Sequence, residues 1–260
     1  MNIIVCVKQV IDPEAPPSSF KIDAAASRAE MRGAPPVIDP YGEYAVEAAL
    51  KIKEAAGGKI TVLSLGVKLL REVVKKPLAM GADALVLLED EAFADADGFT
   101  VASALAAAVK KLDGYDLVLC GREASDNNAG QTGAGIAETL GIPCVTLARK
   151  IEALDGKLRV ERVTSTGYEV VETPLPALVT VSNEVGEPRY PTIKGIMAAR
   201  KIEPVVWKSA DISLPAGGRR VKVSRLYQPV HEGKCEFAGG DTPEEAGANL
   251  AAKLREAKVL

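Results

Sequence analysis

Residues 59–90 read KITVLSLGVKLLREVVKKPLAMGADALVLLED and set the architecture of the chain. The apolar runs at 59–66 and 82–90 predict strands buried on both faces. The segment 68–82 between them predicts a helix that Pro77 bends or ends. A strand, a helix and a second strand of these lengths make a βαβ unit, whose strands are parallel.

The same alternation continues on both sides of this unit. Ile3–Val7 reads as a buried strand, and residues 40–58 predict an amphipathic helix with Pro40 in its first turn and Gly57 at its end. A helix and two strands are expected downstream, at 97–112, 115–121 and 142–148. We therefore expect an α/β fold, a doubly wound and mostly parallel sheet with helices on both faces.

The remaining segments differ from this alternation in composition and in hydrophobic pattern. Residues 15–40 hold several prolines and predict a loop or a short hairpin, whereas 157–182 predicts an antiparallel hairpin that turns at 165–167 and leads into one more buried strand. The final helix, 243–258, ends an arm with too few apolar residues for a core of its own. We expect residues 1–228 to form an α/β domain and residues 229–260 to form a C-terminal arm that docks on another surface.

Composition narrows the classes of function. The 260 residues are 47% hydrophobic and carry a net charge of -3, which gives no electrostatic reason to expect nucleic acid. The apolar run at the start is shorter than the ~20 residues that span a bilayer, and no charged leader precedes it. We expect no nucleic-acid partner, no membrane span and a cytoplasmic location.

Cysteine and histidine usage argues against metal and triad chemistry. Cys6, Cys120 and Cys144 lie in or beside strand-like runs, Cys235 stands apart, and no C-x-x-C pair occurs. Such cysteines are typically buried small hydrophobes. His231 is the single histidine, so neither a zinc site nor a Ser-His-Asp triad is expected.

The segment GREASDNNAGQTG, residues 121–133, follows the strand predicted at 115–121. Ligands of open α/β sheets bind beyond the carboxyl ends of the strands. A helix that begins near Gln131 would point free N–H groups at an anion there, and glycines allow a close approach. This chemistry suits a nucleotide, whose ribose hydroxyls have partners in Asp126, Asn127 and Asn128.

An alternative needs no ligand. The pattern is neither a P-loop nor the dinucleotide fingerprint. The glycines then serve turns or close helix packing, and an acid or amide caps the helix: Gly121, Gly130, Gly133 and Gly135, with Asp126 or Asn128 as the cap. The local chemistry leaves both interpretations open.

Several stretches resemble the β subunit of electron transfer flavoprotein, in the order of that family. They are VKQVID, DPYGEYAVEAALKIKE, GREASDNNAGQTG, LPALVTV and EPRYPTIKGIMAARK, at 7–12, 39–54, 121–133, 175–181 and 187–201. The resemblance implies an electron carrier built as a heterodimer with an α subunit, which supplies most of the site of one FAD at the interface. We therefore expect an electron carrier subunit and not a lone enzyme.

The resemblance also implies a second adenine nucleotide, AMP or a second FAD, held by this subunit. Mapped by motif, the pocket residues are Cys6, Asp39, Pro40, Tyr41, Gly42, Leu65, Gly121, Arg122, Glu123, Ala124, Ser125, Asp126, Asn127, Asn128, Ala129, Gly130, Gln131 and Thr132. The side chain missing at Gly130 leaves room for a flavin and favours the electron-bifurcating, NADH-dependent type, whereas Thr132 resembles the AMP type. Gly42 departs from the family pattern, so its contact is expected through backbone only.

In the family, the segment 187–201 engages acyl-CoA dehydrogenases of the kind that serve fatty acid β-oxidation. Ile193 matches the hydrophobic anchor of that loop, with Ile196 and Met197 beside it, and Glu169 matches an acid that meets a partner arginine. Without the resemblance, Ile193 and Met197 would read as the core stripe of a short helix. An inserted EVG at 184–186 leaves the approach of the loop open.

Two other classes of protein share parts of this pattern. A stand-alone adenine-nucleotide-binding module of the stress-protein type shares the α/β plan but needs neither the 187–201 loop nor a terminal arm. An adenylating enzyme of similar fold would carry a loop rich in Ser and Gly after the first strand, where this chain has KQVIDPEAPP at 8–17.

Overall fold

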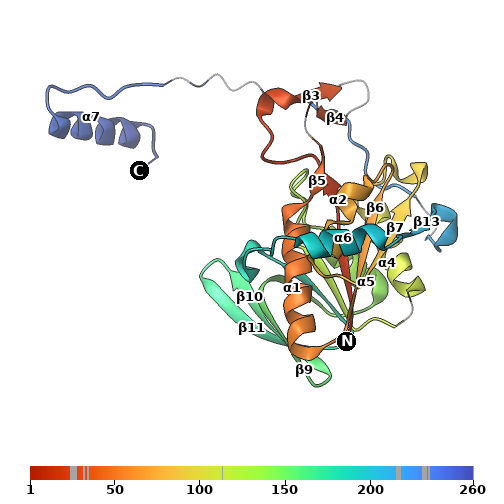
Figure 1. Ribbon diagram of the computed structural model, residues 1–260. Helices are drawn as coiled ribbons and strands as arrows, with labels where there is room; N and C mark the ends of the chain where they lie inside the picture. Colours follow the sequence, from red (N-terminus) through yellow and green to blue (C-terminus); the bar gives the residue numbers. More distant parts are fainter. Residues whose placement is uncertain are drawn as a thin grey trace. The chain divides into compact units, whose positions relative to one another are not determined.

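The computed structural model describes residues 1–23, 28–31, 33, 35–112, 114–214, 218–229, 233 and 235–259 (Figure 1). His231 lies outside these residues. The chain divides into two compact units, residues 1–224 and 225–260. In the second unit, helix α7 (Pro243–Glu256) begins at Thr242, whose hydroxyl accepts from the Glu245 amide and caps the helix.

A nine-stranded sheet forms the centre of the first unit. Its strand order is β11-β10-β9-β12-β8-β1-β6-β7-β13, in which β10 is antiparallel to both of its neighbours, β9 and β11, and the other neighbouring pairs are parallel. The strands span Asn2–Val7 (β1), Lys59–Gly66 (β6), Ala84–Glu89 (β7), Leu117–Gly121 (β8), Cys144–Leu154 (β9), Lys157–Thr164 (β10), Gly167–Pro174 (β11), Ala177–Val181 (β12) and Val205–Trp207 (β13).

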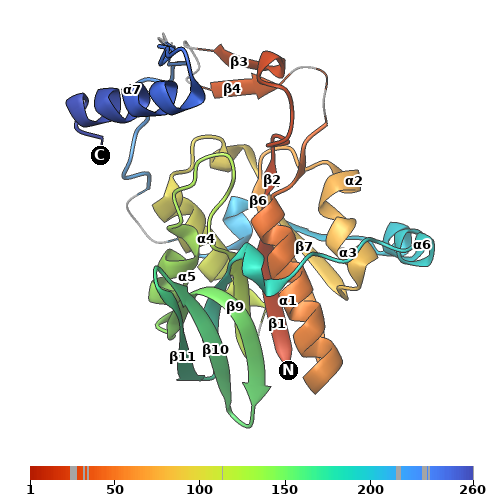
Figure 2. The same ribbon diagram turned by 90° about the vertical axis from the view of Figure 1, so that its left-hand side faces the viewer.

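Helices cover both faces of this sheet (Figures 1 and 2). Alternate residues of β1 enter two different cores: Ile3 and Val5 pack under α1 and α3, whereas Ile4 packs under α4 and α5. This alternation follows from the two-residue period of a strand. The helices span Pro40–Ala56 (α1), Arg71–Val74 (α2), Lys76–Met80 (α3), Gly98–Lys111 (α4), Thr132–Leu140 (α5) and Ile193–Lys201 (α6). The predicted doubly wound α/β fold is thus confirmed.

Two predicted elements differ in detail. The helix expected at 68–82 is two short helices that meet at Lys75, because Pro77 has no N–H to donate to the preceding turn and occupies the first turn of α3 instead. The strand expected at 142–148 is longer and continues as β9 to Leu154, so that β9, β10 and β11 form an antiparallel meander. The hairpin turn predicted at 165–167 is confirmed.

Small elements complete the unit. The segment 15–40 holds the short hairpin that its sequence allows, and β2 pairs with β5 beside it. Sequence reasoning missed β13, which adds to the edge of the sheet beside β7. These elements span Gln9–Val10 (β2), Phe20–Asp23 (β3), Arg28–Met31 (β4) and Val37–Ile38 (β5), with 3-10 helices at Pro17–Ser19 (η1), Glu91–Phe93 (η2), Asn183–Val185 (η3) and Ser209–Asp211 (η4).

Among the described residues, no helix combines the length and apolar character that crossing a bilayer requires. The expectation that the strand cysteines are buried holds for Cys6 and Cys120 but is wrong for Cys144, which is exposed at the start of β9.

Candidate functional site

A cavity of about 380 Å³ opens at the carboxyl ends of the central strands. Cys6 of β1, Leu65 of β6 and Cys120 of β8 line it, together with the loops that follow these strands. Parallel strands bring their carboxyl ends to one edge of the sheet, which is where open α/β sheets bind ligands. The volume falls within the ~300–1,000 Å³ typical of small-molecule sites.

Asp39 ties the start of α1 to the glycine-rich segment 121–131. Its buried carboxylate accepts hydrogen bonds from the Tyr41 amide at 3.0 Å and from the amide and hydroxyl of Ser125 at 2.6 and 2.7 Å. A Cβ on Gly121 would lie 2.5 Å from the Cβ of Tyr41, so only glycine permits this contact. Together these contacts hold one wall of the cavity against α1.

Lys8 joins the end of β1 to the same segment. Its ammonium donates to both carboxylate oxygens of Asp126, at 2.7 and 2.6 Å. Both side chains are more than a third exposed, and pairs of this kind contribute only ~0–1 kcal/mol. Lys8 lines the cavity, whereas Asp126 does not. If this ion pair opened, the Lys8 ammonium would be available to a ligand in the cavity.

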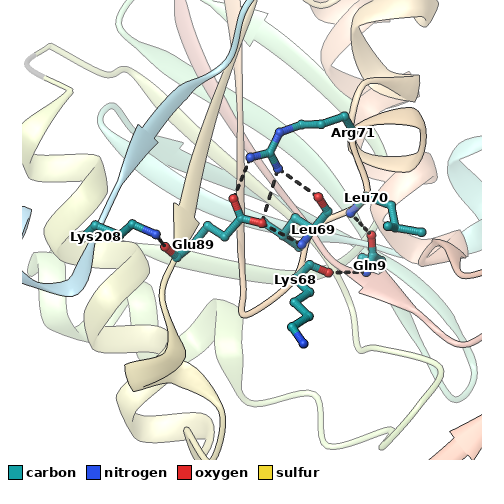
Figure 3. A network of polar contacts seen from close by, with 7 residues as sticks. All are labelled: Gln9, Lys68, Leu69, Leu70, Arg71, Glu89 and Lys208. Carbon is teal, nitrogen blue, oxygen red and sulfur yellow. Dashed lines mark hydrogen bonds and ion pairs between the residues drawn. The ribbon is translucent and has the colours of Figure 1, made fainter.

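The loop after β6 forms another wall, and Glu89 holds it in place (Figure 3). The Glu89 carboxylate accepts from the Leu69 amide at 2.8 Å and pairs with Arg71 at 2.6 Å, while Lys208 donates to the Glu89 carbonyl at 2.7 Å. The hydrogen bond from Arg71, more than that from Leu69, lowers the pKa of Glu89 despite partial burial. The Glu89 carboxylate therefore stays ionised at neutral pH.

Gln9 of β2 reinforces the same loop through its side-chain amide. It donates to the Lys68 carbonyl at 3.0 Å and accepts from the Leu70 amide at 2.8 Å. The Lys68 side chain points away from this network (Figure 3), and within the described part of the chain its ammonium makes no hydrogen bond or ion pair. Lys68 lines the cavity, so its charge remains free for an anionic ligand.

Two helices begin at the cavity. The N-cap residue of α5, Gln131, makes no side-chain hydrogen bond to the helix, so the first amides of α5 are available to a ligand. The expectation that an acid or amide between 126 and 128 caps α5 is wrong: Asp126 pairs with Lys8, and the Asn127 side chain accepts from the Ala129 amide. A left-handed φ of 49° at Asn128 turns the chain before the helix instead.

Asp97 caps the other helix, α4, and also holds a distant segment. One carboxylate oxygen accepts from the amide and hydroxyl of Thr100, and the other accepts from the amides of Arg220 and Val221 at 2.6 and 2.8 Å. Burial opposes ionisation, but these hydrogen bonds outweigh it and hold the pKa of Asp97 well below its ordinary range. Asp97, which lines the cavity, therefore holds Arg220 and Val221 as well as the start of α4.

Most of the predicted pocket residues line the cavity: Cys6, Asp39, Gly42, Leu65, Gly121, Arg122, Glu123, Ala124, Asn127, Ala129, Gly130, Gln131 and Thr132. Five others stand outside the lining: Pro40, Tyr41, Ser125, Asp126 and Asn128. Those five shape the walls through the cap, stacking, ion-pair and turn contacts around them. Nucleotide contact by either group stays a prediction.

The packing interpretation of the glycines is partly right. A Cβ on Gly133 would lie 2.6 Å from the Thr180 side chain, and one on Gly135 would lie 2.8 Å from Ala102, so both positions need glycine for close packing. Gly130 has a left-handed φ of 61° and also lines the cavity. Turn, packing and cavity roles therefore coexist in this segment.

Sequence reasoning missed one side of the cavity. Most of the missed lining residues follow β1, β6 and β7: Lys8, Gln9, Gly66, Val67, Lys68, Leu69, Phe93, Ala96, Asp97, Gly98 and Val101. The others lie within strands or helices: Val7, Leu105, Cys120 and Gly133. Ligands of open α/β sheets bind beyond the carboxyl ends of the strands, so the residues that follow Leu65 are candidates as much as Leu65 itself. Asp97, which precedes a glycine, is a recognisable helix cap. Extending that rule past each strand end would have found most of them.

A separate apolar surface lies on α6. Ile193 is 81% exposed and Met197 is 59% exposed, so the alternative that they form a core stripe is wrong. The buried face of the helix carries Ala199 instead, and Gly195 lies so close to α3 that a Cβ would meet the Ala79 carbonyl at 2.3 Å. Ile196 turns toward a groove between α6 and α2–α3.

The chain that leads into α6 is clamped to α1. Arg189 pairs with the buried Glu47 at 2.9 Å and also with the exposed Glu54. The inserted residues form η3, in which Val185 is buried and its carbonyl accepts from Lys51 at 2.8 Å. These contacts fix how the 187–201 segment approaches the domain. The pKa of Glu54 is lowered chiefly by its hydrogen bond with Arg189.

Glu169 lies on β11, the edge strand of the sheet. It pairs with Arg162 of β10 at 2.7 Å, and both side chains are exposed. A partner arginine would have to compete with this pair, whose contribution at a surface is small. Contact between Glu169 and a partner stays a prediction.

The fold and the cavity define a doubly wound α/β domain with a ligand-sized site at the carboxyl edge of its sheet. Residues 30–212 match the family described as the electron transfer flavoprotein domain. The chain belongs to this family, as a β subunit.

Full-length relatives support that assignment. The electron transfer flavoprotein subunit beta of Thermoanaerobacterium thermosaccharolyticum is 40% identical, and the caffeyl-CoA reductase-Etf complex subunit CarD of Acetobacterium woodii is 37% identical; each comparison covers 100% of both chains. The electron transfer flavoprotein subunit beta of Mycobacterium tuberculosis is 39% identical over 82% of this chain and 81% of its own. Relatives of these kinds make the chain an electron-carrier subunit, whose counterpart is an α subunit.

Proposed function

We propose that this chain and its α subunit carry electrons between a dehydrogenase or reductase of the acyl-CoA type and a second redox partner. The relative named for a caffeyl-CoA reductase complex, which matches along its entire length, supports this class of partner. Bound flavin supplies the redox chemistry, and the chain supplies binding and orientation. A cytoplasmic location and a part in fatty acid β-oxidation belong to the same proposal.

The cavity carries the second part of the proposal: it holds an adenine nucleotide. The start of α5, which its N-cap residue leaves without a side-chain cap, offers backbone amides to a phosphate, and the Lys68 ammonium, which pairs with none of the described residues, adds positive charge. Lys8 joins it when its surface pair with Asp126 opens. A glycine at 130 leaves the lining without a side chain there, which favours FAD over AMP.

AMP is the second candidate for this cavity. Thr132, at the start of α5, matches the AMP-binding members of the family and lines the cavity. A stand-alone nucleotide module is disfavoured, because the relatives match this chain from end to end as β subunits.

Co-expression with the α subunit tests the function directly. We expect a yellow heterodimer, from which heat denaturation and chromatography release two FAD per dimer. One FAD with one AMP would establish the simple carrier in place of the bifurcating type. A colourless monomer that carries no nucleotide would refute the carrier proposal altogether.

A further inference from the structure

Cys6 and Cys120 form a pair of thiols on neighbouring strands. They are register partners in the parallel pairing of β1 with β8, so both side chains project from the same face of the sheet. Both belong to the core under α4 and α5. Neighbouring strands lie about 4.8 Å apart, which falls inside the ~4.4–6.8 Å between Cα atoms that a disulfide requires.

The two thiols also interact with each other. The pKa of Cys120 is raised first by a hydrogen bond with the Cys6 thiol and then by burial. Cys144 and Cys235 are exposed, and neither lines the cavity. The chain thus has one adjacent pair of buried thiols in its described part and two exposed thiols that can be removed without touching it.

The pair faces the cavity. Cys6 is 9% and Cys120 is 5% exposed, and both line the cavity, so a reagent can approach them through it. Buried cysteines packed on all sides are inert, because nothing reaches the sulfur. Here reagent access depends on whether the cavity is filled.

We propose that Cys6 and Cys120 form a dithiol site that a two-electron thiol oxidant converts to a disulfide when the cavity is empty, and that a bound adenine nucleotide shields. The two thiols lose two protons and two electrons, and one S–S bond forms. An oxidant of the diazene class, such as diamide, accepts both hydrogens and becomes the hydrazine. The shielding rests on the nucleotide site proposed above, whereas disulfide formation in the empty chain does not.

The experiment uses the full chain with Cys144→Ser and Cys235→Ser, stripped of nucleotide and treated with diamide. Intact mass after capping with N-ethylmaleimide should show a monomer that has lost two hydrogens and takes up no label. The rate should rise with pH and still be rising at about pH 8.5, the ordinary pKa of a thiol, because the thiolate is the reacting form and the pKa of Cys120 is raised. With AMP or FAD at about 100 times its Kd, the rate should fall roughly 100-fold, since only the empty fraction reacts.

Two variants, Cys6→Ala and Cys120→Ala in the same background, control for intermolecular reaction and should give no intramolecular disulfide. Circular dichroism before and after treatment confirms that the reaction occurs in the folded chain. Persistence of two free thiols in the empty, folded chain would overturn the inference. Equilibrium dialysis of AMP and FAD is run on the same sample: measured binding without protection refutes the shielding, whereas absent binding refutes the nucleotide site and leaves the dithiol result standing.

Discussion

Individual residues at the cavity have different structural roles. Asp39 and Asp97 each use both carboxylate oxygens, one for a helix start and the other for a segment far away in the chain. Charge-assisted hydrogen bonds of this kind are stronger than neutral ones, and they hold the walls without contributing a catalytic group. Lys68 and Gly130 differ from these two aspartates, because the contacts they make leave them open to a ligand in the cavity.

Gly130→Asn tests the room in the cavity. Asparagine tolerates a left-handed φ better than other side chains, and a Cβ at this position would meet only the Arg122 carbonyl, at an ordinary 3.4 Å. The backbone should therefore persist while the side chain enters the cavity. We expect the heterodimer to lose the FAD of this subunit and keep the FAD at the interface, measured as flavin released per dimer. Two retained flavins would show that the second FAD does not occupy this space.

Asp90 gives the fold a predicted dependence on pH. Hydrogen bonds from the Ser209 amide, the Ala92 amide and the Ser209 hydroxyl lower its pKa from 3.8 to about 2. The lowered pKa means that its stabilising contribution is complete above pH 3.8 and is lost as the pH falls through about 2. Thermal unfolding between these values should show a smaller loss of Tm for Asp90→Asn than for the parent chain. Parallel pH profiles would contradict the assignment.

At the scale of elements, α1 connects the two surfaces of interest. Its start carries Asp39 at the cavity, and its middle carries Glu47, which pairs with Arg189 ahead of α6. Short elements do the rest of the positioning, since η3 docks the inserted residues and α3 packs on Gly195. The cavity and the exposed surface of α6 are therefore both positioned by contacts with the same helix, α1.

Glu47→Gln tests the clamp between α1 and the 187–201 segment. Glu47 is buried and its partner Arg189 is charged, so loss of the carboxylate should cost roughly 2 kcal/mol in the free energy of unfolding. Glu54→Gln is the matched control, because it removes the other carboxylate of the same arginine at an exposed position. Chemical denaturation of both variants gives the comparison. Equal effects would mean that burial of the pair does not matter.

At the scale of the whole molecule, the proposed nucleotide site and the proposed docking surface lie on different elements. The cavity lies at the carboxyl edge of the sheet, whereas the exposed apolar residues Ile193 and Met197 lie on α6. No residue of α6 lines the cavity, so the two can be altered independently.

Ile193→Ala should slow electron transfer to an acyl-CoA dehydrogenase without changing flavin content. Truncation of an exposed apolar anchor removes its contact with the partner, and the apparent KM for the dehydrogenase should rise roughly tenfold. Leu154→Ala, at an exposed leucine on the end of β9, is the control and should leave the KM unchanged. An unaltered rate for Ile193→Ala would show that the anchor lies elsewhere.

The amino-acid sequence by itself determined the α/β plan, the strand ends and the glycine-rich wall. These are local properties, because hydrophobic period, helix caps and glycine positions are set by neighbours in the chain. Tertiary structure alone decided which distant residues meet: the pairing of Glu47 with Arg189, the hydrogen bonds from the amides of Arg220 and Val221 to Asp97, and the register of Cys6 with Cys120. Such contacts depend on strand order and helix packing, which no local pattern encodes. Exposure of Ile193 was decided in the same way, since a helix stripe looks identical in sequence whether it faces a core or solvent.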